Sequence, residues 1–290
     1  MPAAGDDDDT ATPGWRWDPT LYAGSARHYA AGRVAYPVEL ADVLTAELGL
    51  DRSGLLLDVG CGPGSLTLLL APRFAGAIGI DADPDMLVEA ARLAREADVD
   101  HVTWRQLRAE ELPADLPRVR VVTFAQSFHW MDRLPVAVAA RALLEPGGAV
   151  VHVHATTHEG VAGEFLPTHP PLPHPLPPRA AVRDLVQRHL GPERRAGQGV
   201  LPAGTAGGED AVYRQAGLTG PRRLELPGRV VERTAEQVVS SVHSLSSAAP
   251  HLFGDRLAAF DAELRALLGA ASPSGRFSEV MGPTGLDVWR

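Results

Sequence analysis

The sequence LDVGCGPGSLT at residues 57–67 restricts the fold more strongly than any other part of the chain. An apolar run ends in three closely spaced glycines, Gly60, Gly62 and Gly64, and a run suited to a helix follows. A short apolar run, a glycine turn and a helix start together predict the first β–loop–α unit of a parallel sheet. Glycines at such a turn let backbone amides approach a ligand that a Cβ atom would keep away. The segment therefore predicts an α/β fold with a ligand site at this turn.

The chain beyond this turn continues the alternation of strand and helix patterns. Asp83 fits the N-cap of one helix, with Pro84 at its first position. The rhythm predicts an α/β, Rossmann-like, doubly wound and mostly parallel sheet with helices on both faces. The expected strands are residues 55–59, 77–81, 102–105, 119–124 and 149–154, and the expected helices are residues 65–71, 86–97 and 133–144.

Composition divides the chain into four regions. Residues 1–14 are small and acidic and are expected to be disordered, and residues 15–155 form the ligand-binding core with an N-terminal lid. Residues 156–220 are a proline-rich insertion with helices, and residues 221–290 add C-terminal helices and edge strands that complete the sheet. The further elements expected are helices at 180–190, 207–216, 234–247 and 255–268 and strands at 222–226 and 286–289.

Prolines dominate residues 167–178 within the insertion. Proline lacks a backbone donor and fixes its own backbone, so this stretch cannot form a helix or a central strand. It is predicted to be a lid over the ligand site or a stiff linker. A proline-rich ligand for a partner domain is the third interpretation.

Charge and composition exclude several classes of function. The formal net charge is −9 and no basic block is present, so nucleic acid is not an expected partner. All 27 basic residues are arginine, which rules out a Schiff-base lysine. Cys61 is the only cysteine, so neither an intrachain disulfide nor a cysteine-based metal site can form. The acidic N-terminus and the lack of a long apolar run predict a cytoplasmic protein without a membrane partner.

The spacing of the glycines separates this turn from a dinucleotide-binding turn. The nicotinamide pattern is G-x-G-x-x-G, whereas here the third glycine comes one residue early and Ser65 takes the sixth place. Asp58 stands shortly before the first glycine. This acid and this spacing resemble motif I of the class I S-adenosylmethionine (SAM) methyltransferases. The resemblance implies SAM as the cofactor.

SAM needs an acceptor for its ammonium group, an acceptor for two ribose hydroxyls and a surface for adenine. Asp58, at the end of the first strand, suits the ammonium, directly or through water. Asp81, at the end of the second strand with Ala82 beside it, suits the ribose because one carboxylate can accept from two vicinal hydroxyls. An acid at this place also occurs in NAD-binding folds, so Asp81 alone does not identify the cofactor.

The third and fourth strands depart from the pattern of such methyltransferases. The loop after the third strand commonly reads Asp-Ala-Glu, with the acid at the adenine amino group, but this chain has Arg108-Ala109-Glu110. We therefore expect Glu110, or backbone groups around Ala109, to meet the adenine. The fourth strand usually opens with Phe-Asp-Leu-Val, and Arg120 here takes the place of the acid. We expect Arg120 to face a sheet edge or solvent.

The loop at residues 124–132 follows the fourth strand and should face the ligand crevice at the carboxyl edge of the sheet. His129 titrates near neutrality and is the candidate catalytic base for an acceptor that must lose a proton. The alternative is that His129 only fixes the loop through a backbone bond. Gln126 is expected to bond to cofactor or substrate. Trp130 is expected to form an aromatic wall beside the sulfonium or the substrate, or to pack in the core.

Several histidines accompany the fifth strand. His152 and His154 alternate along the strand and should share a face, and His158 or Glu159 could complete a metal site with them. The same residues suit contacts to a substrate at the strand end. We favour that role for His154 and expect no metal.

Two more runs extend the resemblance. Residues 29–37 read YAAGRVAYP and residues 125–132 read AQSFHWMD. With the glycine loop, they resemble the type 11 methyltransferase-domain family of class I SAM methyltransferases, in its trans-aconitate-methyltransferase-like, actinobacterial branch. The resemblance covers about residues 22–155 and implies a seven-stranded sheet with an N-terminal segment folded over the cofactor. It implies that Tyr29 and Arg33 contact the methionine carboxylate. Tyr22 is a candidate for contact with the substrate. The alternative is that these aromatics only pack a helix on the core.

The sequence thus predicts a SAM-dependent methyltransferase acting on a small-molecule acceptor, with secondary-metabolite biosynthesis as the implied setting and with a homo-oligomer or a hetero-partner left open. One alternative keeps the fold without methyl transfer, as a cyclisation or elimination catalyst or a partner subunit. Arg108, Arg120 and the proline-rich stretch motivate it. A nicotinamide oxidoreductase is disfavoured by Ser65.

Overall fold

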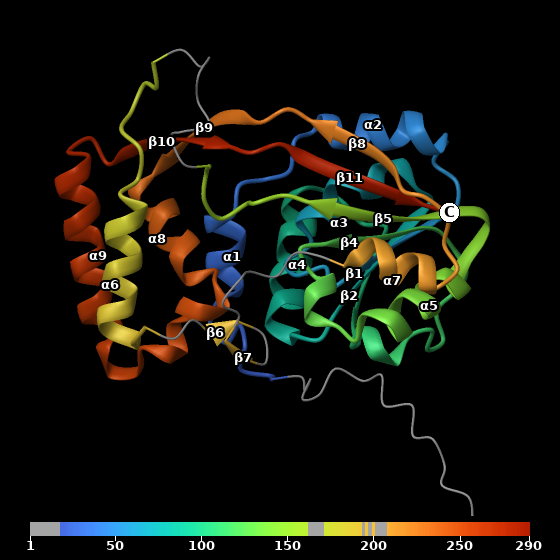
Figure 1. Cartoon of the computed structure of the whole chain (residues 1–290), viewed down its shortest axis with the longest axis horizontal. Coiled ribbons are helices and arrows are strands. Elements are labelled where there is room, and N and C mark those ends of the chain that lie inside the picture. Colours follow the sequence, from blue (N-terminus) through green and yellow to red (C-terminus); the bar gives the residue numbers. More distant parts are fainter. Residues whose placement is uncertain (1–17, 162–170, 193–194, 197–198, 201–207) are drawn as a thin grey trace, which may run out of the picture.

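A computed structural model describes residues 18–161, 171–192, 195–196, 199–200 and 208–290. The predicted tail at residues 1–14 and the first part of the proline-rich stretch lie outside the described residues. Figure 1 shows a large part built around one twisted sheet and a smaller part made mainly of helices, with the helix α1 between them.

Seven strands form the main sheet in the order β3-β2-β1-β4-β5-β11-β8. The first five pair in parallel, and β11 pairs antiparallel with both β5 and β8. This arrangement confirms the predicted doubly wound, mostly parallel seven-stranded sheet. The chain reverses its direction of travel across the sheet between β1 and β4, and ligands of such sheets bind at the carboxyl ends of the strands at that point. The seven strands are β1 (Leu55–Val59), β2 (Gly76–Asp81), β3 (Val102–Gln106), β4 (Val119–Ala125), β5 (Leu144–His154), β8 (Arg222–Leu226) and β11 (Thr284–Trp289).

Helices cover both faces of this sheet (Figure 1). On one face, Leu40 and Leu44 of α2 and Leu66 of α3 pack against buried strand residues. On the other face, Val136 of α5 and Tyr213 of α7 do the same. The bounds of the helices around the sheet are α2 (Glu39–Leu48), α3 (Ser65–Leu70), α4 (Pro84–Glu96), α5 (Arg133–Leu143) and α7 (Glu209–Gln215).

Two segments of the sheet differ from the sequence prediction. Residues 145–148 were expected to form a loop, but they lie within β5, where the pairing slips between Val119 and Val121 of β4. An irregular register of this kind accommodates extra residues in one strand, which lets glycine and proline sit there. β11 was expected at the edge, but it lies between β5 and β8, because Leu286, Val288 and Trp289 are all buried.

A smaller helical subdomain lies beside the sheet and consists of α6 (Arg179–Leu190), α8 (Ala235–His243), α9 (Leu257–Ala271) and the antiparallel pair β9 (Arg229–Thr234) and β10 (Arg276–Met281). No pattern in the sequence predicted β9 or β10. The helices share an apolar core that includes Leu185, Phe260 and Leu264. A short two-stranded pair, β6 (Arg195–Ala196) and β7 (Gly199–Val200), lies nearby.

The helix α1 (Ala26–Gly32) packs on the helical subdomain. Gly32 approaches α8 so closely that an added Cβ atom would lie 2.3 Å from the backbone of Ser240. Ser25 also donates to the carbonyl of His243 over 2.8 Å. The N-terminal segment therefore docks on residues that follow it by more than two hundred positions in sequence.

No helix among the described residues is long and apolar enough to cross a lipid bilayer.

Candidate active site

Two adjoining cavities open at the carboxyl ends of β1, β2 and β4. The larger has a volume of about 700 Å³, counted with its solvent-open space, and the smaller about 400 Å³. Tyr29, Gly60 and Ala125 line both of them. Ligands of such sheets bind in clefts at this edge that are lined by apolar side chains and a few polar groups. The site thus lies where the glycine loop predicted it.

The glycine loop adopts a backbone conformation that is unfavourable for residues with a Cβ atom. Gly60 has a φ of 68°, and an added Cβ atom would lie 2.5 Å from the Cβ atom of Ser127. The amide of Gly62 donates to Oδ2 of Asp81 over 2.8 Å. The loop at the end of β1 is therefore pinned both to the loop after β4 and to the end of β2.

Asp81 lies in the larger cavity, as does its neighbour Ala82. Its Oδ1 atom accepts from the amide of Asp83 over 2.9 Å, in addition to the bond from Gly62. Burial raises the pKa of Asp81 to about 6, although the two amide bonds act to lower it. Each carboxylate oxygen has a second lone pair, so Asp81 can still accept from two hydroxyl groups of a ligand.

The smaller cavity holds one acidic and one basic side chain, Asp58 and Arg33. The carboxylate of Asp58 is almost fully buried and accepts from Thr67 over 2.6 Å and from Thr123 over 2.7 Å. Burial raises its pKa above the usual range. The Arg33 guanidinium lies 4.4 Å from the centre of the Tyr29 ring. The cavity therefore offers opposite charges to a ligand.

The segment after β3 contributes Arg108, Ala109 and Glu110 to the larger cavity. Glu110 also accepts from the amide of Asp132 over 3.0 Å, which links this segment to the loop after β4. Arg120 lies away from both cavities. It donates to the carbonyl of Gly49, the residue after α2, over 2.7 Å.

Only some of the site residues predicted in the loop after β4 line the larger cavity. Gln126 and Trp130 line the larger cavity, and Gln126 has a strained backbone with φ 58°. Such strain at a ligand site is held by the surrounding fold. Trp130 meets the ring of Tyr22, which also lines the cavity, edge to face at 6.0 Å.

His129 lines neither cavity. The residues Phe128–Trp130 form a 3₁₀ turn, in which successive side chains point in three different directions. Phe128 points into the core and Trp130 to the cavity, and the ring of His129 lies 4.8 Å from the ring of Trp130, tilted by 47°. Burial lowers the pKa of His129 to about 4, so the ring is neutral at physiological pH.

The histidines of β5 share one face, as their alternation predicted, but they do not converge on the cavities. The rings of His152 and His154 stack at 4.4 Å. His152 is buried and bonds to the hydroxyl of Tyr213, and His154 is exposed and bonds to Asp287. No metal-binding group of three acidic, histidine or cysteine side chains occurs within the described part of the chain. His154 therefore lies apart from the candidate site.

Sequence reasoning missed several residues of the site. Thr157 lines the smaller cavity and accepts, through its carbonyl, from the amide of Val34 over 2.7 Å. No motif marks Thr157, and only its position beyond the end of β5 could have indicated it. Apolar side chains of the larger cavity were also missed, namely Leu21, Met86, Leu107 and Met131.

Comparisons with known proteins agree with this geometry. Residues 56–148 match the family described as "Methyltransferase domain". An uncharacterized methyltransferase of Mycobacterium tuberculosis is 34% identical over 145 residues, which are 50% of this chain and 56% of the relative. A trans-aconitate 2-methyltransferase of the same species is 31% identical over 118 residues, 40% of this chain and 39% of the relative. The chain thus spans only about half the length, or less, of these curated relatives.

A solved structure supports the fold. A candidate type II methyltransferase from Anaeromyxobacter dehalogenans superposes with a TM-score of 0.52 over 89% of this chain and 96% of its own length, at 22% identity. Residues 56–148 of this chain are therefore similar to a methyltransferase domain and lie in a Rossmann-like fold, and S-adenosyl-L-methionine is the cofactor that this similarity indicates.

Proposed function

We propose that the protein transfers a methyl group from SAM to a small-molecule acceptor. The proposal rests on the two adjoining cavities and the different polar groups that they contain. Asp81 stands in the larger one with free acceptor capacity for ribose hydroxyls, and Asp58 and Arg33 stand in the smaller one with opposite charges for a zwitterionic amino acid. SAM is a nucleoside joined to such an amino acid, so one molecule would fill both spaces.

The proposed pose follows from the lining of the cavities. The adenine would lie between Met86 and Leu107, near Glu110, and the methionine end would pass Gly60 toward Arg33. The sulfonium would then lie close to the shared wall formed by Tyr29 and Ala125. Methyl transfer is a direct displacement, so the protein's main contribution is to align the acceptor atom with the methyl carbon and the leaving sulfur.

We further propose a carboxylate acceptor. A carboxylate is already ionised and needs no base, and His129, the candidate base, lines neither cavity. One relative is named as a trans-aconitate 2-methyltransferase, and trans-aconitate is a carboxylic acid. The setting in secondary-metabolite biosynthesis rests on the family resemblance.

Calorimetry with SAM and with S-adenosylhomocysteine tests the proposed cofactor. Transfer of label from methyl-labelled SAM to a panel of small carboxylic acids, amines and phenols then tests the acceptor. We expect binding of both cofactor forms and labelled methyl esters. A folded protein that binds neither form contradicts the proposed function, and label found only on amines or phenols contradicts the carboxylate acceptor.

The affinity for SAM should depend on the ionisation of Asp81. The ribose hydroxyls bond to the ionised carboxylate, whose pKa is about 6. Affinity should therefore be full above that pH and fall as the pH decreases below about 6, approaching tenfold per unit. Calorimetry from pH 5 to pH 8 measures this. Asp81→Asn, which does not titrate, should bind weakly and without the pH step. If the SAM affinity of Asp81→Asn fell by the same factor between pH 8 and pH 5, the pH dependence would belong to a group other than Asp81.

Replacing His129 with alanine should change little. Because its side chain lies off both cavities, SAM affinity should stay within about twofold and turnover should fall by less than about tenfold, whereas removing a general base costs roughly 10²–10⁴-fold. Single-turnover transfer to an acceptor from the panel measures the rate. A loss of about 100-fold or more, with SAM affinity kept, would identify His129 as the base after all.

A further inference from the structure

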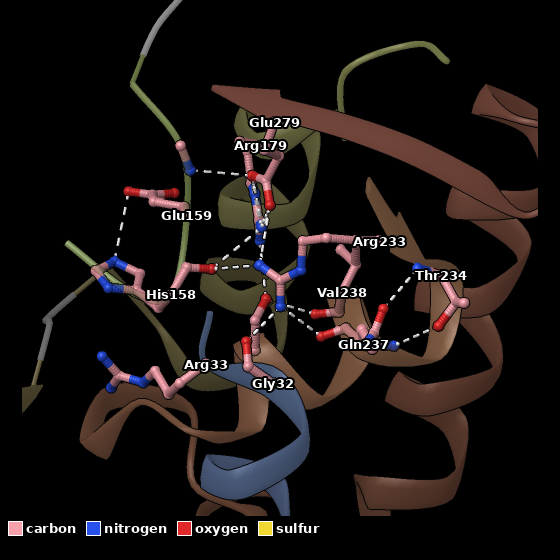
Figure 2. Close-up of polar contacts among 12 residues, drawn as sticks. Gly32, Arg33, His158, Glu159, Arg179, Arg233, Thr234, Gln237, Val238 and Glu279 are labelled. Atoms are coloured by element: carbon pink, nitrogen blue, oxygen red, sulfur yellow. Dashed lines mark hydrogen bonds and ion pairs between the residues drawn. The ribbon is translucent and has the colours of Figure 1, made fainter. Parts of the chain in front are cut away.

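A buried cluster of charges joins the helical subdomain to the edge of the candidate site (Figure 2). Arg233 of β9 and Glu279 of β10 each expose only 3% of their side chains. Nη1 of Arg233 donates to Oε2 of Glu279 over 2.9 Å. Arg179 of α6 forms a forked pair with the same carboxylate, from Nε to Oε1 over 2.9 Å and from Nη2 to Oε2 over 2.9 Å, and the amide of Gly160 also donates to it. Glu279 is thus held from three sides.

The remaining donors of Arg233 bind backbone carbonyls. They reach the carbonyl of Gly32 at the end of α1, that of Gln237 over 2.8 Å and that of His158 over 3.0 Å. Figure 2 shows these carbonyls turned toward one guanidinium from separate segments. A planar guanidinium with fixed donor directions suits such a junction, and a lysine ammonium does not.

Two of these carbonyls belong to segments that form a wall of the smaller cavity. Gly32 directly precedes Arg33, and His158 directly follows Thr157. Both Arg33 and Thr157 line the cavity. The two segments also bond to each other, since the amide of Val34 donates to the carbonyl of Thr157 over 2.7 Å. Arg233 therefore fixes this wall from behind without touching the cavity.

The orientation of the Arg33 side chain depends on this wall. Its Nε donates to Oγ of Ser244 over 2.9 Å, and its Nη2 donates to the carbonyl of Ser244 over 3.1 Å. These bonds hold the guanidinium from the α8 side, while its backbone is anchored through Gly32. A shift of Gly32 would move the backbone of Arg33 relative to Ser244 and turn the guanidinium away from the cavity.

We propose that Arg233 is a positioning residue for the amino-acid end of the cofactor. It holds the carbonyls of Gly32 and His158 so that Arg33 points into the smaller cavity and receives the ligand's carboxylate. This inference rests on the proposed function. It predicts that Arg233 affects binding of the methionine part of the cofactor and not of the adenosine part.

Two ligands separate these parts. S-adenosylhomocysteine contains both, and 5′-methylthioadenosine has the same nucleoside without the amino-acid group. In Arg233→Lys, which keeps the charge next to Glu279 but loses the planar fork, we expect S-adenosylhomocysteine to bind about tenfold more weakly or worse, the value of one charge-assisted bond. Methylthioadenosine should bind within about twofold of the parent protein. Isothermal calorimetry measures both constants.

Leu264→Ala is the matched control. It removes a buried side chain from the core of the same helical subdomain and leaves every contact of Arg233 in place. It should lower the melting temperature without changing the ratio of the two affinities. If Arg233→Lys weakens both ligands equally, or neither, or if Leu264→Ala changes the ratio as much, then Arg233 is only a structural residue.

A second variant tests the inference if Arg233→Lys fails to fold. The change Arg233→Met removes the guanidinium and leaves Glu279 paired with Arg179, so no buried carboxylate is left unpaired. It should show the same selective loss for S-adenosylhomocysteine, and an unchanged ratio would overturn the inference. Failure of the proposed function looks different, because the parent protein would then bind neither ligand.

Discussion

Replacing Asp81 with alanine should weaken SAM binding by about 100-fold, equivalent to roughly 2–4 kcal/mol for paired charge-assisted bonds. The substitution removes the group in the larger cavity that we expect to accept from both ribose hydroxyls. It also releases the amide of Gly62, so the glycine loop loses its tie to the end of β2. Calorimetric titration with SAM and with S-adenosylhomocysteine measures the change.

Asp85→Ala is the control for this experiment. Asp85 is an exposed acid in the first turn of α4, four residues after Asp81, and it lines neither cavity. Its loss should leave SAM affinity within about twofold, with a small cost to the helix dipole interaction. An Asp81→Ala protein that is folded and binds SAM as tightly as the parent would show that the ribose lies elsewhere.

Adding one methyl group at Gly60 should destabilise the fold far more than adding it at Gly62. Both glycines have positive φ, 68° and 53°, which costs an alanine roughly 1–2 kcal/mol at either position. At Gly60 the new Cβ atom would also lie 2.5 Å from the Cβ atom of Ser127, which is fixed to its own backbone. At Gly62 nothing lies within 4 Å. We expect Gly60→Ala to lose about 3 kcal/mol or more of unfolding free energy and Gly62→Ala about 1–2 kcal/mol.

Urea unfolding of the two variants measures this difference directly. The pair is matched in residue type, loop and backbone strain, so the difference isolates the contact with Ser127. Equal losses would mean that the loop after β4 moves aside. In that case the packing between the glycine loop and the loop after β4 is deformable. The effect of Gly60→Ala should then be measured on SAM affinity instead.

Local signals in the sequence were sufficient for the core of the fold. The strand β1 has the predicted bounds, and Asp83 accepts from the amide of Asp85 as an N-cap with Pro84 behind it. These features depend on a few neighbouring residues, so the sequence contains all the information they need. The gathering of Asp58, Asp81 and Gln126 at one edge followed from the rule that parallel strands end together.

The parts that were not predicted depend on partners far away in sequence. β9 and β10 pair across more than forty residues, and their charged members Arg233 and Glu279 are stable in the interior only together. Nothing in either segment alone marks a buried arginine. Similarly, the sequence singled out His129 by its loop alone, whereas the contacts of its ring depend on the 3₁₀ turn Phe128–Trp130.

The attachment of α1 to the helical subdomain also fixes an order of events during synthesis. The glycine loop and Asp81 are synthesised before the helical subdomain, and the strands around them can pair as soon as β4 is made. The docking surface for α1 is complete only when Arg233, Ser240 and His243 have followed, 201 residues after Gly32 in the case of Arg233. Closing so long a loop is slow and comes late in folding. The walls that the N-terminal segment gives to both cavities, including Tyr29, are therefore completed last.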